Sequence, residues 1–114
     1  MKSEITLIPD GDYHDRYLKV TVSQRRVHVD GEQRHLPDRE FILLAALIAN
    51  AGQVLDRAMV LERLWNGDLG PKSRTLDVHI HRIRARLGKH GPKYIETVFG
   101  KGYRFNPQSE VPRV

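Results

Sequence analysis

The segment Arg74–Leu87 brings together the side chains best suited to bind a polyanion. At helical spacing its apolar residues form one narrow stripe, made of Leu76, Ile80, Ile83 and Leu87. The rest of the surface has four arginines against the single acid Asp77. A solvated helix face normally alternates acids with bases, so this face is better suited to phosphate groups than to water.

The positive charge of the chain is concentrated around this segment. Residues 1–73 contain ten basic and eleven acidic side chains, which gives a net charge of −1. Residues 74–105 contain eight basic and two acidic side chains, a net charge of +6, and residues 106–114 are neutral. The whole net charge of +5 therefore lies in one third of the chain. Clustered basic charge is typical of nucleic-acid binding, whereas diffuse basic charge is not.

Composition and motifs exclude several other classes of protein. With 114 residues the chain suits one domain, and the absence of cysteine rules out disulfides, thiolate metal sites and cysteine nucleophiles. No apolar run approaches the roughly 18–20 residues of a membrane span, and residues 1–10 lack the apolar centre of a signal peptide. We therefore expect a cytoplasmic location.

Enzymatic and metal-binding functions find no support. There is no glycine-rich phosphate loop, nucleophile elbow or paired-carboxylate motif. His79 and His81 are two residues apart on a helix and diverge, and the other histidines have no ligand spacing. We expect no catalytic residue, no metal, no cofactor and no small-molecule substrate.

The N-terminal third predicts a small antiparallel sheet. Apolar and polar residues alternate in Leu18–Val22 and Val27–Val29, Asp30-Gly31 is a strong hairpin signal, and Gln33–Leu36 is the expected return strand. The apolar run Ile5–Ile8 also indicates a short strand. Residues 1–16 are either an edge strand or a linker, residues 17–106 form the domain, and residues 107–114 are a tail.

A helical period begins after this sheet. Pro37 and the acids that follow favour a helix start, and Asn50-Ala51-Gly52 favours its end. Asp56 is a good N-cap for a second helix that runs to about Trp65. The basic helix is expected from about Lys72 to Leu87, where Gly88 can close it.

A hairpin is predicted at the end of the domain. Tyr94–Val98 and Tyr103–Phe105 flank the turn Phe99-Gly100-Lys101-Gly102. Sheet, three helices and hairpin, in this order and with the third helix basic, describe an α+β winged helix-turn-helix. This conclusion needs only periodicity, turn residues and charge.

Several motifs then resemble one family, the OmpR/PhoB-type DNA-binding domains of bacterial response regulators. Leu36–Leu44 resembles the family's first helix, and Arg57 and Leu61 ahead of Trp65 resemble its second. Arg74–Arg84 resembles its recognition helix, and Tyr94–Phe105 resembles its wing. The match extends from about Leu18 to Phe105 with family-like spacing.

The resemblance implies transcriptional control through double-stranded DNA. The recognition helix would enter the major groove, and the wing would reach the neighbouring minor groove. It also implies head-to-tail dimers on direct repeats, and a receiver domain elsewhere in the source protein. RNA polymerase would meet the loop before the recognition helix, here Asn66, Gly67, Asp68, Leu69 and Gly70.

Roles for the base-contacting residues follow from this picture. We expect Arg82, in the middle of the outward face, to recognise a guanine and Val78 to contact a thymine methyl group. Thr75 and Asp77, in the first turn of the helix, are the other two base-contact candidates. For Asp77 three roles stay open: accepting a hydrogen bond from cytosine, orienting Arg74, or favouring the helix N-terminus.

Other residues are assigned to the DNA backbone and the wing. The phosphate candidates are Trp65, Arg74, His79, His81, Arg84 and Arg86. The wing candidates are Thr97, Phe99, Lys101 and Tyr103. Trp65 is equally compatible with the core, and Tyr103 and Phe105 are expected to pack the wing onto the helices.

The sequence departs from the family pattern at the wing and on the helix. Phe99 stands where arginine is frequent, and Lys101 is the nearest replacement for that charge. His81 stands where a second arginine is common. A function of a different class also stays open, in which a winged helix docks an acidic protein through its basic face.

Overall fold

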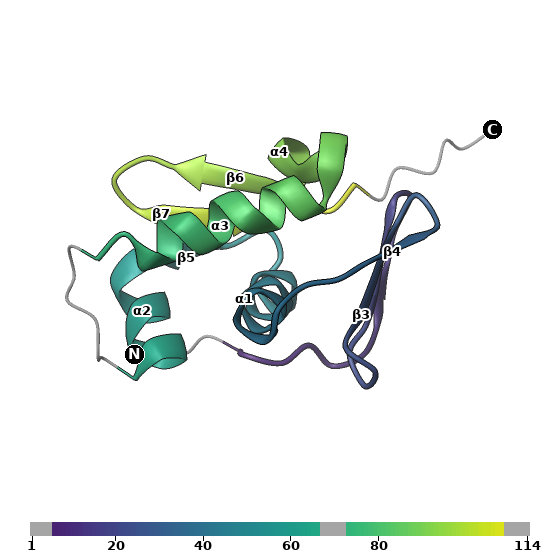
Figure 1. Cartoon of the computed structure of the whole chain (residues 1–114). Coiled ribbons are helices and arrows are strands. Elements are labelled where there is room, and N and C mark those ends of the chain that lie inside the picture. Colours follow the sequence, from purple (N-terminus) through teal and green to yellow (C-terminus); the bar gives the residue numbers. More distant parts are fainter. Residues whose placement is uncertain (1–5, 67–72, 109–114) are drawn as a thin grey trace.

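The computed structural model describes residues 6–66 and 73–108. Its element order is a four-stranded sheet, two helices separated by one short strand, the basic helix, two short helical turns and a hairpin. Helix α1 lies at the centre, with the N-terminal sheet on one side, α2 on the other and α3 with the hairpin above it (Figure 1). The α+β class and the winged helix-turn-helix order are confirmed. No helix among the described residues is long and apolar enough to cross a membrane.

The N-terminal sheet is an antiparallel meander. Its strands are β1 (Tyr13–His14), β2 (Leu18–Thr21), β3 (Arg26–Val29) and β4 (Glu32–Arg34), in that spatial order. Asp30 and Gly31 both have positive φ, as a two-residue hairpin turn requires, so the predicted hairpin is confirmed. The return strand is shorter than predicted and begins one residue earlier.

The segment before this sheet was predicted only in part. Tyr13–His14 pairs with β2 as an edge strand, but residues 6–12 form no strand. Instead, the backbone of Thr6 exchanges hydrogen bonds with the side chain of Asn50 at the end of α1, and Leu7 packs against the core. The expectation of a strand at Ile5–Ile8 was therefore wrong for its described part.

The helices follow the predicted apolar periods. Helix α1 covers Asp38–Ala49, α2 covers Arg57–Trp65 and α3 covers Thr75–Arg86. Asp56 caps α2 as predicted, because its carboxylate accepts a hydrogen bond from the Met59 amide at 3.1 Å. Helix α3 begins at Thr75, three residues after the predicted start, and the Ser73 hydroxyl ahead of it accepts a hydrogen bond from the Thr75 amide at 3.1 Å.

The C-terminal sheet has three strands where a two-stranded hairpin was predicted. Strand β7 (Gly102–Phe105) lies between β6 (Ile95–Val98) and β5 (Val54–Asp56), a strand that precedes α2. Tyr94 belongs to the short helix α4 (Gly91–Tyr94), which follows a 3-10 turn, η1 (Gly88–His90), so its assignment to a strand was wrong. Gly88 has positive φ just after α3, which confirms that it closes this helix.

A buried carboxylate joins the N-terminal sheet to the end of the domain. Asp15 is 9% exposed and accepts hydrogen bonds from the hydroxyls of Tyr13 and Tyr94. It also accepts from the amides of Tyr17, Leu18 and Gln108 at 3.0–3.1 Å. Burial alone would raise the pKa of Asp15, but these hydrogen bonds outweigh burial and leave the pKa lowered. We call this group of residues the Asp15 cluster.

Candidate nucleic-acid interface

Helix α3 is oriented by its apolar stripe. Leu76, Ile80, Ile83 and Leu87 are each at most 1% exposed, so this side faces the core as predicted. The opposite side presents Val78, His81, Arg82 and Ala85 to solvent. Burial of a stripe four side chains long fixes the rotation of the helix, and thereby decides which side chains face outward.

Arg82 is the least constrained of the arginines of α3. Its side chain is exposed and forms no hydrogen bond or ion pair with another described residue. Beside it, Val78 is 41% exposed, which is unusual for a branched apolar side chain on a charged face. Arg82 therefore has its donors free, and Val78 adds an apolar spot next to them.

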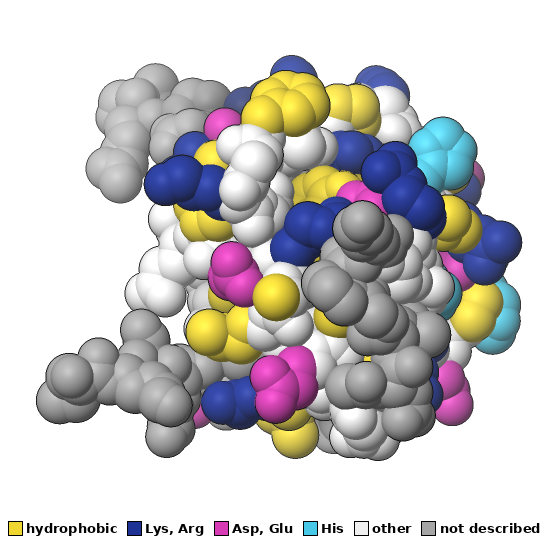
Figure 2. All heavy atoms as spheres, turned by 90° about the vertical axis from the view of Figure 1, so that its left-hand side faces the viewer, with side chains coloured by type: hydrophobic (Ala, Val, Ile, Leu, Met, Phe, Trp, Pro, Cys, Tyr) yellow, Lys and Arg dark blue, Asp and Glu magenta, His cyan; other side chains and the backbone are white. Residues whose placement is uncertain are grey.

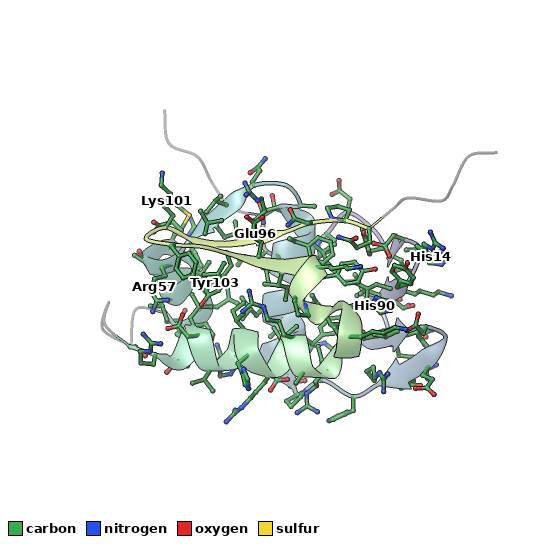
Figure 3. The ribbon with its side chains drawn as sticks, turned by 90° about the horizontal axis from the view of Figure 1, so that it is seen from above. His14, Arg57, His90, Glu96, Lys101 and Tyr103 are labelled. Atoms are coloured by element: carbon green, nitrogen blue, oxygen red, sulfur yellow. The ribbon has the colours of Figure 1, made fainter. Side chains whose placement is uncertain are left out.

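Asp77 is bonded within the protein. Arg57, from the first turn of α2, donates to both its carboxylate oxygens, at 2.6 and 3.0 Å, and also to the Ser73 carbonyl at 3.0 Å. The hydroxyl of Tyr103 donates to the same carboxylate, and Figure 3 shows Arg57 and Tyr103 side by side between α3 and the hairpin. We call Arg57, Asp77 and Tyr103 the Asp77 cluster.

The Asp77 cluster has a defined electrostatic character. The hydrogen bonds from Arg57 lower the pKa of Asp77, opposed by burial and assisted by Tyr103. Burial, as the larger cause, and the hydrogen bond to Asp77 together raise the pKa of Tyr103 to about 12. Arg74 lies 3.5 Å from Asp77 and is 82% exposed, a weak contact that agrees with an orienting role. A base contact by Asp77 would require exchange of its present partners.

Two further arginines on α3 also have partners inside the protein. Arg84 donates to the Ile95 carbonyl at 2.7 and 3.1 Å and to the Thr97 hydroxyl at 2.8 Å, which ties α3 to the wing. Arg86 pairs at 2.8 Å with Glu40, a residue of α1 that is 3% exposed. Phosphate contacts by Arg84 and Arg86 stay predictions. The sequence reasoning missed these bonds because a helical projection shows a flank but not its neighbour.

The flank near α2 contains Trp65 and His79. Trp65 is half-buried, with the Arg39 guanidinium 5.4 Å from its ring centre and His79 in edge contact at 5.2 Å. A ring nitrogen of His79 lies 2.9 Å from the Thr75 carbonyl. Partial burial leaves both predicted roles of Trp65 open. Asn66 ends α2 with positive φ, and the remaining candidates for a polymerase contact, residues 67–70, lie outside the described residues.

The wing presents a rigid turn. The Lys101 amide donates to the Val98 carbonyl at 2.9 Å, and the Arg57 amide donates to the Lys101 carbonyl at 3.1 Å. A Cβ at Gly102 would lie 1.9 Å from the Leu55 carbonyl oxygen, so only glycine allows β7 to pack this closely on β5. Phe99, at the tip, is 88% exposed. Tyr103 and Phe105 are buried, which confirms that they pack the wing.

Basic side chains meet at this end of the molecule. An open hollow of about 460 Å³ between α3 and the wing is lined by Arg57, Arg74 and Arg84 together with Phe99. Figure 2 views this end and shows Lys and Arg side chains grouped beside exposed hydrophobic ones. Lys101 lies at the tip of the hairpin (Figure 3). Basic residues of the segment 74–105, whose net charge is +6, thus lie on the surface where α3 and the wing meet.

A sheet, three helices and a hairpin that follows the basic third helix and lies beside it define a winged helix-turn-helix domain. Residues 31–105 match the family model described as "Transcriptional regulatory protein, C terminal". The chain therefore belongs to this family of OmpR/PhoB-type domains.

Named relatives and solved structures agree. The chain is 36% identical over 97 residues to the sensory transduction protein RegX3 of Mycolicibacterium smegmatis, covering 83% of this chain and 42% of RegX3. It is 34% identical over 84 residues to the phosphate regulon regulatory protein PhoB of Pseudomonas aeruginosa, covering 74% of this chain and 37% of PhoB. It thus spans about two fifths of the length of these relatives.

Among solved structures, the response regulator DrrB of Thermotoga maritima, an OmpR/PhoB homologue, matches with a TM-score of 0.77 and 37% identity. That match covers 84% of this chain and 44% of DrrB. The DNA-binding domain of RstA from Klebsiella pneumoniae, solved in complex with the RstA box, also has a TM-score of 0.77, with 32% identity. It covers 85% of this chain and 98% of the RstA domain.

Proposed function

We propose that this domain binds double-stranded DNA in a sequence-specific manner and thereby regulates transcription, as the effector part of a two-component response regulator. The observation that supports this most strongly is the free, outward Arg82 beside Val78 on a helix whose opposite stripe is buried. A single helix fits the major groove, and an arginine fork matches the two acceptors of guanine. The RstA domain, solved with its DNA box, has the same fold.

In this proposal α3 enters the major groove and the wing meets the adjacent minor groove. Arg82 and Val78 recognise bases, whereas the exposed Arg74 and His81 contact phosphates and set the register. Two copies bind direct repeats head to tail, a receiver domain precedes this one in the source protein, and the loop at residues 66–70 meets RNA polymerase. The matched family and PhoB are named as regulatory proteins, and we expect no enzymatic activity of this domain.

The test is a salt titration of DNA binding after selection from a random pool. The chain first selects its preferred duplex, and its dissociation constant for that duplex and for random DNA is then measured from low to high salt. We expect a steep linear dependence of log Kd on log salt, since phosphate contacts release counterions. A shallow dependence or no DNA binding would reject the proposal and favour the docking of an acidic protein.

Variants then separate specific from non-specific contacts. Arg82→Ala should cost about 1–3 kcal/mol on the selected duplex and relax base preference at one position, with little change on random DNA. Arg74→Ala should weaken both duplexes alike and reduce the salt slope by about one. Lys19→Ala is the matched control, because Lys19 lies on the N-terminal sheet at the opposite end from the wing (Figure 1). Equal losses for Arg82→Ala on both duplexes would contradict its assignment.

A further inference from the structure

Phe99 has an exposure that folding alone does not explain. Among the described residues only Ile8, Val78 and Phe99 are large, hydrophobic and exposed, and Phe99 is the most exposed at 88%. It occupies the turn of the wing next to Gly100, whose φ is 79°. No other ring contacts it among the described residues. The ring is therefore left in water at the tip of the molecule.

Hydrogen bonds fix the backbone of the turn that carries this ring. The Lys101 amide closes the turn onto Val98, and the Arg57 amide ties the Lys101 carbonyl to the start of α2. Gly102 packs directly against the backbone of Leu55, and the antiparallel pairing of β7 with β5 sets the register of the hairpin. Because the backbone of the turn is already ordered, binding through Phe99 costs only the ordering of its own side chain, less than the same ring on a flexible loop would cost.

The surroundings of the ring indicate its partner. Lys101 is two residues away, and the described lining of the adjoining hollow has Arg57, Arg74 and Arg84 against the single acid Asp77, so the net charge around the ring is positive. A protein-docking site would be expected to place further apolar side chains around the ring. Of the described apolar side chains that line this hollow, only Phe99 is fully exposed, since Tyr103 is buried and Val98 partly buried. One exposed ring bordered by cations fits a nucleic-acid groove instead, where cations contact phosphates and an apolar wedge contacts sugars and base faces.

We propose that Phe99 enters the minor groove beside the site of α3 and wedges against one base step. This inference rests on the proposed DNA binding. It predicts that the wing prefers easily deformed base steps in the DNA, because pyrimidine–purine steps such as TA and CA unstack most easily. An arginine at the same position would prefer a narrow A-tract groove, because its charge follows the enhanced negative potential there.

The experiment uses the duplex that the chain selects from a random pool. Hydroxyl-radical footprinting locates the base step under the wing, and that step is then made TA, CA or AA in otherwise identical duplexes. A 2-aminopurine placed at the step reports unstacking through increased fluorescence. We expect the TA and CA duplexes to bind about tenfold more tightly than the AA duplex, with a rise in fluorescence on binding.

Variants at the tip test the ring and the charge separately. Phe99→Ala should weaken binding to the TA duplex about tenfold and abolish the fluorescence rise, with the salt slope unchanged. Phe99→Arg should reverse the preference toward AA and increase the slope by about one. Lys101→Ala is the matched control: it should reduce the slope by about one and keep the fluorescence rise. Circular dichroism checks that each variant is folded.

The outcomes separate the inference from the function on which it rests. If the chain selects no duplex, both fail. If it selects one with a steep salt dependence but Phe99→Ala binds all three duplexes as the unmodified chain does, only the wedge is rejected. If Phe99→Ala keeps the affinity of one copy but abolishes binding of two copies to adjacent sites, the ring is a protein contact and the wedge is also rejected.

Discussion

The Asp15 and Asp77 clusters stabilise a carboxylate inside the domain in two different ways. Each places a partly or fully buried carboxylate between segments distant in sequence, and each uses a tyrosine hydroxyl as a donor. The described donors to Asp15 are all electrically neutral, whereas Asp77 is bound chiefly by the guanidinium of Arg57. Asp15 joins the sheet to the chain end, far from the basic surface. Asp77 joins α2, α3 and the wing beneath it.

This difference in donors indicates that the Asp15 cluster holds the fold together, whereas the Asp77 cluster belongs to the DNA-binding surface. A carboxylate satisfied by neutral dipoles in a buried site is little affected by salt or by a nearby polyanion. A carboxylate paired with a half-exposed guanidinium is sensitive to both, since phosphate competes for the same cation. Stability should therefore depend more on Asp15, and DNA recognition more on Asp77.

The largest effect is expected for Asp15→Asn. An amide offers one oxygen and places its own NH₂ group against donors, so at least one buried donor loses its acceptor. We expect the free energy of unfolding to fall by about 3 kcal/mol. Urea denaturation followed by Trp65 fluorescence measures it. Asp38→Asn, in an exposed pair with Arg25, should change stability by less than about 0.5 kcal/mol. A similar loss for both variants would remove the distinction drawn for Asp15.

Breaking the Asp77 pair is expected to come next. Arg57→Gln removes the cation that binds both oxygens of Asp77 and, among the described cations, leaves only the exposed Arg74 at 3.5 Å. We expect a loss of about 2 kcal/mol in unfolding free energy together with weaker binding to the selected duplex. The double variant Arg57→Gln with Asp77→Asn should recover part of the stability, because no unpaired charge remains. Strictly additive losses in this double-mutant cycle would show that the pair does not act as a unit.

Removing one tyrosine hydroxyl from each cluster compares them directly. Tyr94→Phe should cost about 1.5 kcal/mol, and Tyr103→Phe about 0.5 kcal/mol, because Arg57 still satisfies Asp77. Urea midpoints measured side by side give the difference. Tyr17→Phe serves as the control, since its hydroxyl bonds to no described residue. If Tyr103→Phe lowered the free energy of unfolding more than Tyr94→Phe, the idea that the Asp15 cluster contributes more to stability than the Asp77 cluster would be rejected.

The smallest effect concerns pH and salt. The pKa of both carboxyls is lowered in the folded state, so each stabilises the fold above the ordinary value of about 3.9. That contribution is lost as the pH falls through the lowered pKa. We expect acid unfolding below about pH 4, with a gentler dependence in Asp15→Asn and in Asp77→Asn. Added salt should weaken the pH dependence of stability that is due to Asp77 more than the part that is due to Asp15. Unfolding curves measured against pH at two salt concentrations check this.

Much of the fold could be predicted because its signals are local. The stripe through Leu76 and Ile83, the cap at Asp56 and the hairpin at Asp30-Gly31 each need only neighbouring residues. Strand β5 could not be found in this way, since three residues identify a strand only through pairing with β7. The helical turns before Tyr94 were hidden by Gly88, Gly91 and Pro92, which also suit a loop.

The interface was predicted at the level of the surface but not of its internal bonds. The outward position of Arg82 and Val78 follows from helical geometry alone. The partners of Asp77 lie 20 and 26 residues away, and those of Arg84 lie across the wing, so only the folded chain reveals them. One available signal was that Asp77 is the single acid among four arginines, which suggests a fixed local use for it.

The position of β7 also determines when the surface can form during synthesis. This strand is the central one of its sheet, yet it is the last to be made, and its partner β5 precedes it by nearly fifty residues. Pairings at such separation close slowly, because the entropy of a long loop is lost first. A nascent chain that has reached Val98 thus has its basic helix but no completed wing. The arrangement delays the reading surface until the core beneath it is nearly complete.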